Sequence, residues 1–518
     1  MSEKLRVVFW LAVTLLAWEA LGRWSPWGYD VISTPTRIAA QYWRDADLYE
    51  PHIAATVRSA LLGFLIGNAF AIVAALLFCR FPSFEAIFRG INIALFAMPP
   101  IVIGPILILI LTGDWPQIIL AALMVYFPTM AAMLVGLHDI DPRLIDVVHL
   151  YGGKEFALTR FVRLRSSLPS LLAGLRVAAS LAVLGAILGE FGSGVRWGLG
   201  TFLLGSLGEA NPARLWGISL AAAALAMIGY GAFDWIGARI GGATTAVTLA
   251  AARLPDQIAG HSRHSLTRRT LLLIAAIALP FVLWEVLLLA TRLSPIIAPG
   301  PLQTLEYLFV GPDAASERQI MLQALAETLP IAGLGLVAGL AAAFVLAALS
   351  ILRPSLVRAL LPAALVLQST PLIAMVPIIL LIFGRGVMAS IVMAVLVVFF
   401  PAFVLLAQGF ALVPRAAREL VQVYGGGPLK ELALVSIPFA VRYLYVAAKL
   451  VAPRALLGVM VAEWLLSGVG LGNLLNVSRG TLDYGMIWAG ALMSILISIA
   501  AYQSVGVVER LVRSTAIV

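Results

Sequence analysis

The stretch ELVQVYGGGPLKELALVSIP, residues Glu419 to Pro438, is a polar interruption in a chain that is otherwise mostly apolar. A similar stretch, DVVHLYGGKEFALTRFVRLR, runs from Asp146 to Arg165. Each copy has an acidic residue ahead of a Tyr-Gly-Gly sequence, and each continues with similarly spaced apolar residues. A polar segment that occurs twice at corresponding places predicts a chain built from two copies of one unit.

The composition predicts a membrane protein. Of the 518 residues, 61% are hydrophobic and 12% are charged, and the mean hydropathy is +1.00. Soluble proteins carry roughly twice that share of charged residues. Apolar runs of about 20 residues, each long enough to cross the hydrocarbon layer as a helix, recur along the chain. They predict an all-α polytopic fold with twelve transmembrane helices, at residues 6–22, 58–78, 92–112, 117–137, 171–190, 215–237, 270–291, 329–350, 360–383, 388–410, 445–465 and 485–507.

The similarity between the two halves extends along their whole length. Corresponding residues are Thr56 and Thr328, Gly63 and Gly335, Gly67 and Gly339, Pro99 and Pro371, Pro105 and Pro377, and Phe127-Pro128 and Phe400-Pro401. Both copies run in the same direction with six spans each, which predicts parallel repeats related by an axis along the membrane normal. We therefore expect a first transmembrane half at 1–237, a polar cytoplasmic linker at 238–269 and a second half at 270–518.

The distribution of basic residues indicates the orientation of the chain. With the N-terminus in the cytoplasm, most of the 35 Lys and Arg fall on the cytoplasmic side, as the positive-inside rule predicts. The net charge of +9 is then a topology signal, and we expect no nucleic-acid partner. Both Tyr-Gly-Gly segments, the linker and both termini are predicted to be cytoplasmic. The basic start MSEKLR imitates a signal peptide, but Trp18-Glu19 is matched by Trp284-Glu285, so we expect this segment to be retained.

Catalytic and metal-binding motifs are not found in the sequence. Cys79 is the single cysteine, and His261 and His264, the only close pair of histidines, fall in the polar linker. The sequence contains no H-E-x-x-H, P-loop or G-x-S-x-G pattern. We expect no catalytic residue, metal site or cofactor in this chain.

The duplicated segment resembles the EAA loop of ABC importer permeases, in which an acid is followed by a glycine and then by an aliphatic-x-aliphatic-Pro sequence. In the second copy these residues are Glu419, Gly425, and the run from Val435 to Pro438. The resemblance covers essentially the whole chain. It is strongest to permeases of the nitrate, sulfonate and taurine type, which share the G-L-G stretches found at 198–200 and 470–472.

The resemblance implies that both segments form coupling helices that dock on two cytoplasmic ABC ATPase subunits, which bind ATP and Mg. The residues it assigns to ATPase coupling are Asp146, Gly152, Gly153, Glu419, Gly425, Gly426 and Pro438. It also implies an external solute-binding protein and a location in the bacterial cytoplasmic (inner) membrane. Permeases of this kind serve nitrate, bicarbonate, sulfonates, taurine and pyrimidine precursors.

The residues of the second copy support this role independently. Residues 414–423 can form a short helix whose apolar side chains Leu420, Val421 and Val423 have no membrane to enter, so a partner groove is a reasonable destination. The run from Gly425 to Pro428 is expected to break that helix, because glycine tolerates a left-handed backbone and the residue before proline avoids the helical conformation. An ordinary solvated loop is the alternative. The first copy has Arg165 in place of Pro438, which predicts a different exit angle from its turn.

Charged residues inside the predicted spans are candidates for the translocation pathway or its gates. Arg176 and Lys449 occupy matching positions, and so do Glu190 and Glu463 at the outer ends of the same spans. Snorkelling to the headgroups is the alternative for the two bases, and a structural bond to the outer loop is the alternative for the two acids. Arg454 follows Pro453 near mid-span without a basic counterpart, so either an anionic substrate or a structural ion pair would offset its charge.

Two other classes of protein share some of these features. An ion-gradient-driven secondary transporter of twelve helices would use carboxylates to bind protons or sodium, with Glu190, Asp234, Glu285 and Glu463 as candidates. A membrane scaffold without transport is disfavoured by Arg454 and by the helix breaks expected at Pro371 and Pro377.

Overall fold

The computed structural model describes residues 3–24, 33–191, 193–209, 211–240, 266–353, 355, 360 and 372–515, and every regular element in these ranges is helical. The first half contains α1 (Glu3–Trp24), α2 (Pro35–Arg44), α3 (Ala46–Arg80), α4 (Pro82–Ala97), α5 (Pro100–Ile110), α6 (Trp115–His138), α7 (Pro142–Leu150), α8 (Glu155–Leu158), α9 (Leu164–Glu190), α10 (Leu199–Leu207) and α11 (Pro212–Ile240). The second half contains α13 (Leu266–Thr291), α14 (Pro301–Phe309), α15 (Ala314–Leu352), α17 (Leu372–Phe383), α18 (Val387–Ala411), α19 (Arg415–Val423), α20 (Pro428–Glu431), α21 (Ile437–Ala462), α22 (Gly470–Thr481) and α23 (Tyr484–Thr515). In the described residues the order of elements in the first half recurs in the second, and the counterpart of α4 falls outside them.

Nine helical segments in the described ranges are long and apolar enough to cross a membrane, or ten if one bent pair counts as a span. The predicted total of twelve is therefore not confirmed. The predicted first span at 6–22 lies in α1, and α17 covers residues 372–383 of the span predicted at 360–383. Most of the predicted linker, residues 241–265 with both of its histidines, lies outside the described residues.

The predicted span at 92–112 is a broken helix. Helix α4 ends at Ala97, α5 begins at Pro100, and the two axes differ by 100°. Met98 is extended, with ψ of 124°, because the residue before a proline avoids the helical conformation. In the second half Pro377 lies within α17, so no break occurs there, and Pro371 lies outside the described residues.

Repeated glycines allow the long helices to pack closely. A Cβ atom added to Gly63 or Gly67 of α3 would collide with Ala121 or with the backbone of Ala122 in α6. The corresponding glycines Gly335 and Gly339 of α15 meet α18 at Ala394 and Val398 in the same way. Close backbone approach through small residues is typical of helix packing in membranes. The glycine pattern of the sequence therefore marks one helix contact that is formed in each half.

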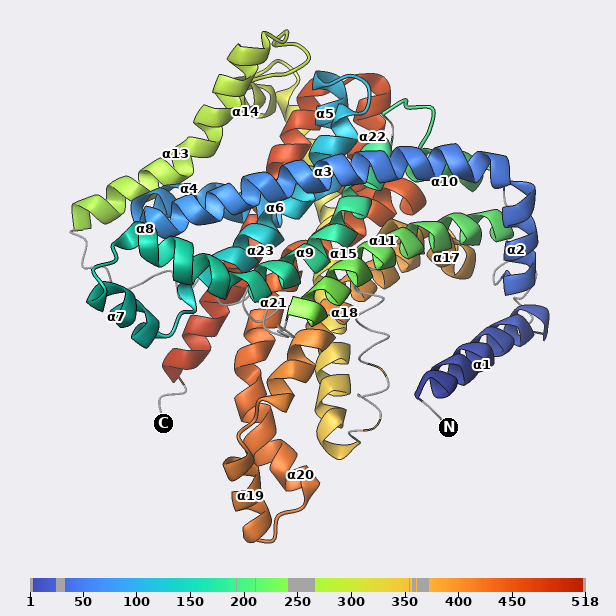
Figure 1. The fold of residues 1–518 in the computed structure, drawn as a ribbon. Coiled ribbons are helices and arrows are strands. Elements are labelled where there is room, and N and C mark those ends of the chain that lie inside the picture. Colours follow the sequence, from blue (N-terminus) through green and yellow to red (C-terminus); the bar gives the residue numbers. More distant parts are fainter. Residues whose placement is uncertain are drawn as a thin grey trace.

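The two halves interleave. Helix α13 of the second half packs against α4 of the first, and α11 of the first half packs against α17 of the second (Figure 1). Helix α5 contacts α21, α22 and α23. One apolar core therefore includes side chains from both halves, such as Val102 of α5, Ile187 of α9, Val376 of α17 and Val459 of α21.

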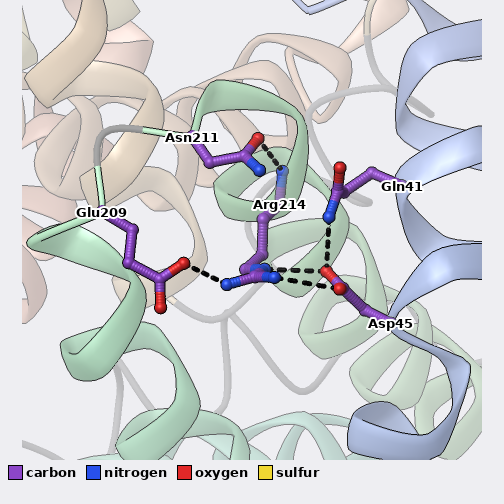
Figure 2. A network of polar contacts seen from close by, with 5 residues as sticks. All are labelled: Gln41, Asp45, Glu209, Asn211 and Arg214. Carbon is purple, nitrogen blue, oxygen red and sulfur yellow. Dashed lines mark hydrogen bonds and ion pairs between the residues drawn. The ribbon is translucent and has the colours of Figure 1, made fainter.

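A polar cluster fastens the start of α11 to the corner between α2 and α3 (Figure 2). Asp45 accepts two hydrogen bonds from the guanidinium of Arg214, at 2.7 and 2.9 Å, and one from Gln41 at 2.8 Å. Arg214 also pairs with Glu209, and its backbone N–H donates to the Asn211 side chain at 3.2 Å. Burial alone would raise the pKa of the Asp45 carboxyl, but these hydrogen bonds outweigh it and hold the pKa below its ordinary value.

We expect this cluster to make stability depend on acid pH. Because the folded-state pKa of Asp45 is lowered, its stabilisation is present above the unfolded pKa and is lost as pH falls through the folded pKa. Arg214→Met should lower the free energy of unfolding by about 2–3 kcal/mol near neutral pH, and by less in acid. Thermal unfolding in detergent between pH 7 and about 2 would measure this, with Arg58→Met, in an exposed 3.5 Å pair with Asp114, as the control. An equal loss at both pH values would contradict the assignment.

Candidate functional site

The polar segment of the second half folds into two short helices, as the sequence predicts. Helix α19 corresponds to the expected helix at 414–423, and α20 follows after a glycine turn. Gly425 has φ of +72°, a left-handed backbone that glycine tolerates, and the helix ends there as expected of the glycine run. Its N–H donates to Gln422 C=O at 2.9 Å, and the N–H of Gly426 donates to Val421 C=O at 2.8 Å. These two bonds form a Schellman motif, which satisfies carbonyls that the end of a helix leaves open.

The first half repeats this geometry at α7 and α8. Gly152 has φ of +74°, and its N–H donates to His149 C=O at 2.9 Å, while the N–H of Gly153 donates to Val148 C=O at 2.8 Å. The second glycine of each pair is needed for space. A Cβ atom on Gly153 or Gly426 would meet the side chain and the carbonyl of the valine five residues earlier.

Apolar and acidic side chains cover the exposed face of both segments. In α19 and its turn, Leu420 is 58%, Val423 82% and Tyr424 84% exposed, and Leu150 and Tyr151 of the first copy are as exposed as the last two. Val421, expected to face a partner, packs instead within its own loop against Gly426. Glu419 and Asp146 are exposed, and neither forms an ion pair with any residue that the structure describes. Figure 1 shows α19 and α20 projecting beyond the rest of the chain.

The two loops differ in their internal contacts. In the second loop the buried Glu431 of α20 lies 4.0 Å from Arg418 Nε and 3.4 Å from Gln422 Nε2, so it connects α20 to α19. In the first loop the buried Leu158 occupies the equivalent place. The first loop has its own ion pair between Glu155 and Arg163, at 2.8 Å.

The chain re-enters each half through a five-residue π-helical turn, Thr159–Arg163 before α9 and Leu432–Ser436 before α21. Because the turn is present in both copies, it does not depend on Pro438, which lies at the start of α21, or on Arg165 in its place. The different exit angle expected for the first copy stays a prediction. The asymmetry lies in the side-chain contacts of the two loops.

At the other end of α9, Glu190 binds the start of α10. Its carboxylate accepts a hydrogen bond from the Thr56 hydroxyl of α3 at 2.7 Å and one from the Gly200 N–H at 2.6 Å. The Leu199 N–H donates to the same threonine hydroxyl at 2.8 Å. Glu190 is 3% exposed and Thr56 is fully buried. The carboxylate therefore caps a helix N-terminus from a different helix, where a negative charge is favourable.

The second half forms the same network with matching distances. Glu463 accepts from the Thr328 hydroxyl at 2.7 Å and from the Gly472 N–H at 2.8 Å, and the Leu471 N–H donates to Thr328 at 2.8 Å. Glu463 is 1% exposed. Both glutamates therefore form the structural bond that the sequence analysis gave as the alternative to a gating role.

The G-L-G stretches are explained by these networks. Gly198 and Gly470 have φ of +153° and +85°, which favour glycine. A Cβ atom on Gly200 would meet Ile187 C=O, and one on Gly472 would meet Met460 C=O. The first glycine of each stretch has a different hydrogen-bond partner. His52 Nδ1 lies 2.9 Å from the Gly198 nitrogen, whereas a carboxylate oxygen of Glu327 accepts from the Gly470 N–H at 2.7 Å.

Arg176 and Lys449 form ion pairs with the last helix of their own half, in place of simple snorkelling. Arg176 of α9 pairs with Asp234 of α11, and Lys449 Nζ of α21 lies 2.6 Å from a carboxylate oxygen of Glu509 in α23. Helices α9 and α21 are thus each fixed at two points. A basic residue nearer the loop forms an ion pair, and a glutamate at the opposite end accepts hydrogen bonds.

Arg454 lies in α21, which continues as a helix through Pro453, so the helix interruption expected there is absent. The side chain is half-buried, and the matching residue Leu181 packs against the shared apolar core. In the described part of the chain no carboxylate pairs with Arg454, so the structural ion pair is not formed there. An arginine near mid-membrane costs roughly 2.5 to 3.5 kcal/mol on insertion scales.

Some contacts were not anticipated from the sequence. Thr56 and Thr328 marked the repeat, but their bonds to the glutamates were not predicted, nor was the pair of Asp45 and Arg214. The signal available was the recurrence of the threonine, the glutamate and the G-L-G stretch in the same order in each half, with spacings that differ by one residue at the glutamate. Among the described residues, no group of three or more His, Cys, Asp or Glu could hold a metal ion.

The fold and the duplicated loops define a membrane protein made of two homologous transport units. The family described as binding-protein-dependent transport system inner membrane component matches residues 67–242 and 335–514, and the chain belongs to this family. It is a non-catalytic permease component of an ABC importer, and the two matches show that two permease units are fused.

Relatives from several bacteria are similar to parts of the chain. A probable ABC transporter permease protein of Haemophilus influenzae is 27% identical over 44% of this chain and 92% of its own length. The riboflavin transport system permease protein RibX of Chloroflexus aurantiacus is 30% identical over 30% of this chain and 58% of its own. The formylaminopyrimidine transport permease protein ThiX of Halalkalibacterium halodurans is 24% identical over 44% and 90%. No solved structure matches the chain.

Proposed function

We propose that this chain supplies both membrane-spanning halves of an ATP-driven importer, with twelve spans and both termini in the cytoplasm of a bacterium. Two cytoplasmic ATPase subunits, which bind ATP and Mg, dock on the loops formed by α7–α8 and α19–α20, and an external solute-binding protein delivers the substrate. The observation that carries the proposal is the duplicated loop, in which exposed apolar side chains surround an exposed acid. Such a face fits a groove on another protein better than it fits water.

The substrate we propose is a small polar or anionic solute of the nitrate, sulfonate, taurine or pyrimidine-precursor class. The relative named for formylaminopyrimidine and a putative aliphatic sulfonates permease SsuC of Bacillus subtilis, 25% identical over 35% of this chain, support this range, whereas the relative named for riboflavin lies outside it. The translocation pathway runs between the halves, beside α9 and α21, where we place Arg176, Glu190, Lys449, Arg454 and Glu463 as gate or pathway residues.

An ion-gradient-driven mechanism has less support. Glu190 and Glu463 are each occupied by a threonine and a backbone N–H, and Asp234 is paired with Arg176. Glu285 is exposed on α13. Carboxylates held in this way are suited to fixing helices in position.

Copurification tests the proposal directly. The chain should be expressed with the ATPase encoded beside its gene, and that ATPase should be recovered with it in detergent and hydrolyse ATP faster when the loaded binding protein is added. Full uptake in membranes that lack any ATPase, driven by a proton or sodium gradient alone, would reject the proposal.

The two loops should differ in their tolerance of charge reversal. At an interface, placing like charges together costs several kcal/mol, so Asp146→Lys and Glu419→Lys should each weaken ATPase recovery. Glu419→Lys should be the more severe, because the second loop keeps the complete family pattern and its two short helices are joined through Glu431. Equal losses in copurified ATPase would show that this asymmetry has no effect on coupling.

A further inference from the structure

Arg454 combines deep placement with residual accessibility. Leu450, Val451 and Gly458, which lie three or four residues from it on the same face of α21, are buried, yet part of the Arg454 side chain keeps solvent-accessible surface. A side chain facing lipid would not be surrounded in this way. The accessible part of Arg454 therefore faces a space inside the protein.

Helix α21 packs against apolar helices of both halves. It contacts α5 of the first half and α17 of its own half, and these helices contribute Val102 and Val376 to the core that the halves share. Next to Arg454 in sequence, Ala455 and Leu456 are buried in the same interior. A single positive charge in such a place requires water or an anion.

Two acids near α21, one directly after its last residue and one on α23, already have partners. Glu463 accepts hydrogen bonds from Thr328 and Gly472, and Glu509 pairs with Lys449. Since no carboxylate in the described part of the chain pairs with Arg454, its guanidinium keeps donors for a ligand.

We propose that Arg454 binds an oxyanion group of the transported solute, such as a sulfonate or carboxylate, in a water-accessible space between the halves. The inference rests on the proposed function and narrows its substrate class to anions. The planar guanidinium donates two parallel hydrogen bonds to two oxygens of one group, which an ammonium does not reproduce. With Leu181 at the matching position of the first half, the site occurs once and is contributed by the second half.

Thiol labelling tests whether the space is accessible. Cys79 is the only cysteine, so Cys79→Ser gives a cysteine-free background in which Arg454→Cys is introduced. In nanodiscs the Arg454→Cys protein should react with the water-soluble anionic reagent methanethiosulfonate ethylsulfonate. Met460→Cys, at a fully buried position of the same helix, is the matched control and should not react. Absence of labelling at position 454 would overturn the proposal.

Titration with methanesulfonate tests anion binding, with the neutral isostere dimethyl sulfone as the control ligand. At constant ionic strength, the wild-type chain in nanodiscs should bind methanesulfonate and should not bind the sulfone. Intrinsic tryptophan fluorescence would measure the binding. Arg454→Gln should weaken binding by about ten- to a hundredfold, the usual range for losing hydrogen bonds to a charged group, and Arg454→Lys should weaken it less. Equal binding by all three proteins would reject the role of Arg454.

Two further outcomes keep the test decisive. Should Arg454→Gln fail to accumulate in the membrane, Arg454→Lys decides, because it keeps the charge and must still bind methanesulfonate more weakly than the wild type. Recovery of the partner ATPase with the wild-type chain is measured separately and requires no anion. Its failure rejects the proposed function, whereas undiminished binding by the Arg454 variants rejects only this inference.

Discussion

Replacing Gly426 by valine should leave the protein in the membrane in normal amount but remove most of the ATPase that copurifies with it. A Cβ atom at this position would meet the Val421 side chain and lie 2.8 Å from the Val421 carbonyl oxygen. That carbonyl accepts the Gly426 N–H, so the bond that ends α19 would be lost together with the turn. The exposed face of Leu420, Val423 and Tyr424 would then be displaced from its present position.

Gly425→Asn provides the matched control. Gly425 also has a left-handed backbone, but a Cβ atom there would meet no other atom within 4 Å. Asparagine tolerates this conformation, whereas most other residues pay about 1 kcal/mol or more. The asparagine variant should therefore retain nearly all of its ATPase. Normal ATPase recovery with Gly426→Val would contradict the role assigned to the loop.

Glu463→Leu should destabilise the chain more than any surface substitution. It leaves the Thr328 hydroxyl and the Gly472 N–H without their acceptor in a buried site. Each unsatisfied buried donor costs about 1–3 kcal/mol, so we expect a total loss of about 2–6 kcal/mol. Thermal unfolding in detergent, followed by loss of the monodisperse protein peak, would measure the effect.

The duplicated geometry supplies a built-in comparison. Glu190→Leu removes the equivalent acceptor from Thr56 and Gly200 and should cost a similar amount, whereas Glu306→Leu, on the exposed surface of α14, should have little effect. Glu463→Gln keeps an acceptor oxygen and should fall between these extremes. If Glu463→Leu unfolds at the wild-type temperature, the carboxylate does not hold α22 in place.

Local signals allowed much of the loop architecture to be predicted from sequence. The helix before Gly425 and the left-handed backbone at that glycine follow from the glycine-rich sequence itself, because both depend on interactions within a few residues. The internal repeat was also predicted correctly, because the two halves can be compared residue by residue in the sequence. Spans that are continuous, apolar and long were also recognised, although the chain bends by 100° within the one predicted at 92–112. The apolar run predicts one continuous span there, although Pro99 favours an extended conformation in the residue before it.

Interactions between distant residues were less predictable. Glu190 and Thr56 lie 134 positions apart, and nothing local to either residue indicates their hydrogen bond. Similarly, Arg176 and Lys449 were recognised as costly charges, but their acidic partners on α11 and α23 depend on how the helices pack. Val421 was expected to face a partner because it is apolar, whereas the space beside Gly426 accommodates it within the loop.

The π-helical turns Thr159–Arg163 and Leu432–Ser436 set the angle by which each loop is rotated about the axis of the span that follows it. A π turn contains one residue more than the α-helical turn it replaces, and one residue corresponds to about 100° of rotation about an α-helix axis. If the same residues formed regular α-helical bonds, with none deleted, the preceding loop would be rotated by about that angle relative to the span. The direction in which Tyr151 or Tyr424 points is thus set by one surplus residue in the turn that follows it.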